Sequence, residues 1–215
     1  LVALFDRVMR NNGGKVSEEE ITLNRLLIAL LKKETAEQAV HFSHEAIEMH
    51  GGNGFIEDFV TPRLLRDAQV LTVWEGTANI LGMEVLRLMS RFKVERIFIE
   101  SMRKRLSSFH FETSIKEPVE GAIVKLQELC HYTSSCAPEV QTVYSKKIAR
   151  LMVKIFESVI ALDGANAGDP REKAKAELFL QMTWKESDTW YDTENKKLQY
   201  FDLIVNWEDS SVVVE

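Results

Sequence analysis

The stretch that decides the fold reads EMHGGNGFIEDFVTPRLLRDAQVLTVWEGTANI over residues 48–80. Its first part holds a cluster of three glycines, Gly51, Gly52 and Gly54. Residues 18–50, which precede the cluster, contain no Gly or Pro and many good helix formers. Because glycine tolerates the backbone that ends a helix, the pattern predicts one long helix over residues 18–50 that stops at the glycines.

The second part of the stretch predicts two shorter helices and the turn between them. Thr61-Pro62 is typical of a helix start, with a capping residue followed by proline. We expect residues 70–74 (VLTVW) to be extended or a buried loop, and Glu75-Gly76-Thr77 to be a turn. After Thr77, apolar residues recur at helical spacing, which predicts a helix to about Phe92.

The rest of the chain also has a helical pattern, so the predicted fold class is all-α. We expect a helical-bundle region over residues 1–92 and a further helical extension over residues 93–215. Pro118 and Pro138 are expected at helix starts. The predicted helices outside the first stretch are 1–10, 93–108, 118–132, 138–162 and 171–191.

Composition excludes several classes of protein. The ten Gly and four Pro in 215 residues are too few for a turn-rich all-β fold. The two Cys give no disulfide framework, and no apolar run is long enough for a transmembrane helix. The chain begins at Leu1 without a signal-peptide pattern, so we expect a cytoplasmic protein and a chain cut from a longer one.

Glu75 is the first candidate catalytic residue. It follows the apolar residues 70–74, so partial desolvation would raise its pKa and suit a general base near neutral pH. The alternative is a carboxylate that only favours the dipole of the next helix. The helix after Thr77 would present free N–H groups to a phosphate. The glycine cluster allows close approach of a ligand, or only of another helix.

Two motifs support a family resemblance. They are E-x-x-GG-x-G, which begins at Glu48, and W-EG-[ST]-x-N, which begins at Trp74. Residues 35–92, which contain both, resemble the C-terminal helical domain of acyl-CoA dehydrogenases, with the AidB-like branch the most similar. The resemblance implies a flavoprotein that oxidises an acyl-CoA thioester. Glu75 matches the base that removes the α-proton, while FAD accepts the β-hydrogen as hydride.

The resemblance also implies how the flavin is held. Gly51, Gly52 and Gly54 match a turn that lies against the FAD of a neighbouring subunit, so a homodimer or homotetramer is expected. Thr77 and Asn79 match residues beside the flavin nucleotide. The electron acceptor is not indicated.

Two departures from the family pattern stand out. Many members have Gln where this chain has Glu48, and a carboxylate would repel a pyrophosphate. The family's other two domains are not found in these residues, so we expect the chain alone to be inactive.

Two further features of the sequence bear on metal binding and on nucleic-acid binding. His41, His44, Glu45 and Glu48 share a helix face, but no second segment supplies further ligands, so no metal site is predicted. Residues 91–116 hold seven basic and three acidic residues in a chain of net charge −6. This patch keeps open an alternative function, a non-catalytic oligomerisation or DNA-associated module, although the acidic remainder argues against it.

Overall fold

The structure is a computed structural model that describes residues 2–10, 16–111, 113–184 and 196–207. Within these ranges every regular element is a helix, and no strand occurs. The predicted all-α fold class is therefore confirmed. None of the described helices is long and apolar enough to cross a membrane.

The chain divides into two compact units that interleave in sequence. The first unit holds residues 1–98 and 129–153, and the second holds residues 99–128 and 154–215. The division falls within three helices, α6 (Val94–Ser107), α7 (Thr113–Ser135) and α8 (Pro138–Ala165). The expected domain boundary at residue 92 stays a prediction.

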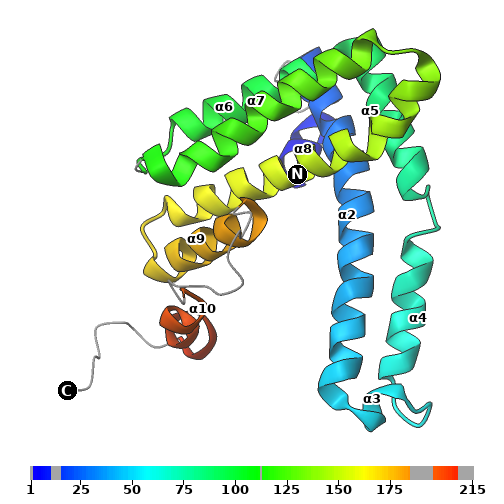
Figure 1. Cartoon of the computed structure of the whole chain (residues 1–215), viewed down its shortest axis with the longest axis vertical. Helices are drawn as coiled ribbons and strands as arrows, with labels where there is room; N and C mark the ends of the chain where they lie inside the picture. The colour runs from blue at the N-terminus through cyan, green and yellow to red at the C-terminus, as the bar shows by residue number, and fades with distance from the viewer. Residues whose placement is uncertain (1, 11–15, 112, 185–195, 208–215) are drawn as a thin grey trace. The chain divides into compact units, whose positions relative to one another are not determined.

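The first unit is built around one long helix, α2 (Glu18–His50). It begins with a capping box, in which the Ser17 Oγ accepts from the Glu20 N–H and the Glu20 carboxylate accepts from the Ser17 N–H. Four helices pack against α2 or beside it, and α4 and α5 run along its length (Figure 1). They are α1 (Val2–Arg10), α3 (Gly52–Phe55), α4 (Thr61–Leu71) and α5 (Ala78–Phe92).

The core of the first unit is aliphatic. Leu26 and Leu30 of α2, and Val85 and Leu88 of α5, are almost fully buried. Burying each of these side chains contributes roughly 1.5–3 kcal/mol. This burial fixes which faces of α2 and α5 point inward, and so fixes where the turn before α5 lies.

The prediction for residues 70–74 was wrong. Helix α4 continues to Leu71, and the next residues form turns in which the Val73 and Trp74 N–H groups both donate to the Val70 carbonyl. Val73 is 60% exposed and Trp74 is 65% exposed, so the segment is not a buried loop. The apolar composition of residues 70–74 predicts an extended segment or a buried loop, but local hydrogen bonds fold the backbone into the end of α4 and the turns that follow.

The second unit contains the remaining helices. Besides its parts of α6, α7 and α8 it holds α9 (Pro170–Trp184), α10 (Lys196–Gln199) and the π-helix η1 (Asp202–Asn206). Its core includes Met102, Leu106, Ile123, Leu126 and Ile155.

Two prolines of this part of the chain were expected at helix starts, and one of them lies elsewhere. Pro138 begins α8 as predicted, but α7 begins at Thr113 and Pro118 lies inside it. Pro118 is the sixth residue of α7, where it removes one backbone hydrogen bond and its ring crowds the carbonyl one turn before, but the helix continues through it. The predicted helix 171–191 is described only as far as Trp184, and its last residues lie outside the described part of the chain.

Candidate functional site

The turn between α4 and α5 carries Glu75 in a left-handed backbone conformation. Its φ is 59°, which is uncommon for a residue with a side chain, and the next residue, Gly76, has φ 109°. Lys32 of α2 holds this turn. Its Nζ donates to the Gly76 carbonyl at 2.6 Å and to the Leu71 carbonyl at 3.2 Å. No sequence pattern indicates this role for Lys32, because its partners lie about 40 residues further along the chain.

The Glu75 side chain is exposed, so its expected desolvation within this chain is wrong. Neither its carboxylate nor its backbone N–H forms a hydrogen bond or ion pair with a described residue. The neighbouring Trp74 also points largely to solvent. Both groups of Glu75, an acceptor and a donor, are therefore available to a molecule outside the described chain.

Thr77 and Asn79 lie next to Glu75 at the start of α5. Thr77 is the N-cap residue, as predicted, but its side chain makes no capping hydrogen bond. The first N–H groups of a helix have no partner within the helix. The exposed Thr77 and Asn79 thus flank an open helix N-terminus, where the field of the helix favours an anion.

The glycine cluster forms the connection from α2 to α3. Gly51 caps α2 with φ 56°, and its N–H donates to the Glu48 carbonyl. Gly54 is buried, and a Cβ there would lie 2.3 Å from the Ile47 carbonyl oxygen, so close packing requires glycine. A Cβ at Gly52 would meet nothing within 4 Å. The chain's own packing therefore explains Gly54 but not Gly52.

The structure does not bring the glycine cluster to Glu75. Lys32 of α2 contacts the turn that holds Glu75, whereas Gly51 follows the last residue of α2. At a rise of 1.5 Å per residue, residues 32 and 51 are about 28 Å apart along the axis. The predicted residues thus form two groups at different levels of the bundle (Figure 1).

A mostly apolar cavity of about 530 Å³ lies beside the glycine cluster. It is lined by residues of α2, α3, α4 and the connection between α3 and α4: Ile47, Phe55, Ile56, Pro62 and Leu65, with Glu57 and Arg66.

The charged residues beside this cavity form pairs. Arg66 binds both carboxylate oxygens of Glu57, at 2.8 and 3.0 Å, and this lowers the pKa of Glu57. Arg63 pairs separately with Asp67 at 3.5 Å.

The histidines and glutamates of α2 and the basic segment over residues 91–116 can also be placed in the structure. The ligand atoms of His44, Glu45 and Glu48 lie within 4.8 Å of one another, and all three residues are exposed. The absence of a metal site stays a prediction. In the basic segment, Arg105 pairs with Asp163 at 2.8 Å and Arg103 donates to Gln127.

The glycine turn and the Glu75 turn both fall within one family match. Residues 10–90 match the family model described as acyl-CoA dehydrogenase, C-terminal domain. These residues belong to the acyl-CoA dehydrogenase family. The chain thus contains the C-terminal helical domain of an acyl-CoA dehydrogenase-like protein.

Individual acyl-CoA dehydrogenase relatives extend the likeness. Acyl-CoA dehydrogenase family member 11 of Caenorhabditis elegans is 30% identical over 204 residues, which cover 87% of this chain and 32% of the relative. The putative acyl-CoA dehydrogenase AidB of Escherichia coli is 33% identical over 89 residues, 41% of this chain and 16% of AidB. The chain thus spans about a third or less of these relatives.

One solved structure resembles nearly all of the chain. The crystal structure of C. elegans ACDH-11 in complex with C11-CoA is 28% identical, with a TM-score of 0.75, and the match covers 96% of this chain and 36% of that one. The likeness therefore continues beyond residue 90, where the family-model match ends.

Proposed function

We propose that the whole protein is an FAD-dependent enzyme that oxidises an acyl-CoA thioester, and that Glu75 is its general base. The observation that carries the proposal is the Glu75 turn. Lys32 holds the backbone of this turn through the Gly76 carbonyl, at the start of a helix, and the Glu75 carboxylate has no partner among the described residues. The complex of the C. elegans relative with C11-CoA supports an acyl-CoA as the substrate.

Glu75 would perform two tasks. Its carboxylate would remove the proton from the α-carbon of the thioester, and its backbone N–H would donate to the thioester oxygen. That hydrogen bond stabilises the negative charge that develops on the oxygen as the proton leaves. The Lys32 clamp would hold both groups in place, so that little reorganisation is needed. Bound FAD would supply the hydride acceptor for the β-hydrogen.

The residues present fit a flavin nucleotide. The open N-terminus of α5, with Thr77 and Asn79, suits an anionic group such as a pyrophosphate. Gly52 has open space where a side chain would lie, so a bound molecule could approach its backbone closely. Gly54 would act indirectly, because it lets the turn fold back onto α2.

The distance between Glu75 and the glycine cluster favours an oligomer. One chain holds Glu75 and the glycine cluster about 28 Å apart along α2. In the family resemblance, the glycine turn lies against the flavin of a neighbouring subunit. We therefore expect a homodimer or homotetramer, in which each flavin contacts two chains.

The direct test uses the full-length protein that contains this chain. We expect the purified protein to be yellow and to bleach when acyl-CoA is added. Glu75→Gln keeps the size of the side chain but removes the base, so this variant should stay yellow and lose bleaching. A protein that binds no flavin, or a Glu75→Gln variant that bleaches at the normal rate, would contradict the proposal.

A second test addresses the flavin contact. Gly52→Leu places a side chain in open space, so the fold should tolerate it, but it should block a flavin at the turn. Gly121→Leu is the matched control, because Gly121 of α7 also has nothing within 4 Å of a Cβ. We expect at least tenfold weaker FAD binding for Gly52→Leu alone. Equal binding by both variants would remove Gly52 from the flavin site.

A further inference from the structure

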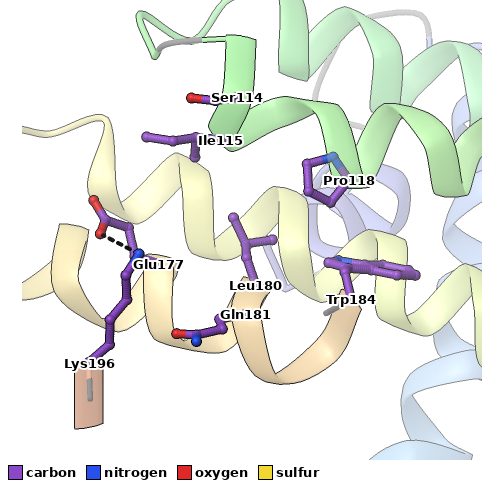
Figure 2. Close-up of a pocket in the computed structure, with 8 residues that line it drawn as sticks. All are labelled: Ser114, Ile115, Pro118, Glu177, Leu180, Gln181, Trp184 and Lys196. Atoms are coloured by element: carbon purple, nitrogen blue, oxygen red, sulfur yellow. Dashed lines mark ion pairs between the residues drawn. The ribbon is translucent and has the colours of Figure 1, made fainter. Parts of the chain in front are cut away.

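The second unit contains a cavity that is unrelated to the Glu75 turn. It has a volume of about 500 Å³ and lies between the first turns of α7 and the last turns of α9. Figure 2 shows Ile115 and Pro118 extending from α7 toward Leu180 and Trp184 of α9. Such a volume and such an apolar lining are typical of sites for small organic molecules.

The aromatic wall of this cavity is held in place. The Trp184 indole N–H donates to the Ser158 Oγ at 2.9 Å, and the Lys154 ammonium lies 5.9 Å from the ring centroid. These contacts fix the orientation of the ring, and Leu180 beside it is 6% exposed. The apolar part of the cavity is therefore preformed, and binding would not require these side chains to be ordered first.

The polar end of the cavity contains an unsatisfied acceptor. The Oε1 of Gln181 is buried and accepts no hydrogen bond from any described residue. A buried amide oxygen without a donor costs about 1–3 kcal/mol. A ligand that donates a hydrogen bond at this position would remove that cost.

The charges at the same end balance one another. The Glu177 Oε2 accepts from the Tyr200 hydroxyl at 2.7 Å. The same oxygen lies 4.0 Å from the Lys196 Nζ, an ion pair that Figure 2 shows. The Glu177 carboxylate raises the pKa of Tyr200 to about 12, so that hydroxyl keeps its proton and continues to donate. With one acid and one base already paired, this end favours a neutral head group over a carboxylate or an ammonium.

We propose that this cavity binds a small, neutral amphipathic molecule whose head group donates a hydrogen bond to Gln181 Oε1. Its hydrocarbon part would pack on Ile115, Leu180 and Trp184. The site lies in the extension, so it requires neither FAD nor Glu75.

Three probes with the same eight-carbon chain test the proposal on the full chain. 1-Octanol has a donor, octyl methyl ether has the oxygen but no donor, and octanoate is anionic. Binding is followed by the NMR signals of the indole N–H groups, since the chain has four Trp and Trp184→Phe identifies the signal of interest. We expect octanol to shift the Trp184 signal and to bind about tenfold more tightly than either of the other probes.

Two variants make the test specific. Gln181→Leu should abolish the preference for octanol over the ether while both still bind, because the acceptor is lost with the amide and the apolar wall of the cavity is kept. Gln127→Leu makes the same change at an exposed position of α7 outside the cavity and should keep the preference. The proposal is overturned by no Trp184 shift up to the solubility limit, by equal affinity for octanol and ether, or by a preference that survives Gln181→Leu.

Discussion

The Nζ of Lys32 donates a hydrogen bond of 2.6 Å to the carbonyl oxygen of Gly76. The bond joins the middle of α2 to a turn whose residues Glu75 and Gly76 both have positive φ. A left-handed residue with a side chain costs about 1 kcal/mol or more, and it persists only where its surroundings hold it. Lys32 is thus a positioning residue for the proposed base.

Replacing Lys32 should loosen the turn. For Lys32→Met we expect a loss of about 1.5 kcal/mol in the free energy of unfolding, because two carbonyl oxygens lose a charged donor. In the full-length protein, kcat should fall more than KM rises, since the base is displaced rather than removed. Lys147→Met, at an exposed lysine of α8, is the matched control. Equal stability of the two variants would show that the clamp contributes nothing.

The glycines at the end of α2 should respond oppositely to alanine. Gly54→Ala places a Cβ 2.3 Å from the Ile47 carbonyl oxygen, which is backbone and cannot rotate away, so we expect a loss of about 2–3 kcal/mol. Gly52→Ala meets no neighbour and has no positive φ, so stability should stay within about 0.5 kcal/mol or rise slightly. Urea unfolding of both variants measures the difference, and similar losses at the two positions would contradict the structure.

The fold was largely predictable because its signals are local. Helix α2 has a capping box at Ser17, no Gly or Pro through His50, and a glycine directly after it. Each of these signals acts on the backbone only a few residues away. Pro118 shows where local signals fail. A proline is favoured at a helix start but also tolerated in an early turn, and only the packing of α7 decides between these positions.

The candidate site was less predictable because its geometry depends on distant contacts. The motif around Glu75 identified a turn before a helix, and the structure has one there. The Lys32 contact spans 44 residues and leaves no periodic signal. The exposure of Trp74 and Glu75 also could not be predicted, because an apolar run near a charged residue does not indicate which face of the backbone is covered.

Glu95 should make the protein less stable as pH rises. Burial raises the pKa of Glu95 above its ordinary 4.5, although its own backbone hydrogen bond and nearby Lys93 and Arg96 oppose the shift. Between 4.5 and the higher folded pKa, the folded state keeps a proton that the unfolded state has lost. Stability from this group is therefore full below pH 4.5 and is lost as pH rises through the folded pKa.

A neutral side chain at this position removes that dependence. Glu95→Gln should be more stable than the wild type at pH 7 and should gain little at pH 4, as measured by urea unfolding at both values. The Glu95 Oε2 is buried without a described partner, which adds to the cost of its charge. Glu100→Gln, at an exposed position of the same helix, is the matched control. A Glu95→Gln variant less stable than the wild type at pH 7 would refute the assignment.

The two cysteines should differ sharply in reactivity. Cys130 is buried, and this burial, together with the Glu95 carboxylate, raises its pKa to about 12. At pH 8 about one Cys130 in 10⁴ would be the thiolate, which is the form that reacts with alkylating agents. Cys136 is partly exposed, and its Sγ donates to the Tyr132 carbonyl at 3.3 Å. Iodoacetamide at pH 8 should therefore modify Cys136 in the native chain and Cys130 only in denaturant, as read by peptide mass spectrometry.

The control is Cys136→Ser, which should leave the native chain unreactive. Alkylation of Cys130 at the Cys136 rate would mean that the α7 core opens far more readily than its packing indicates.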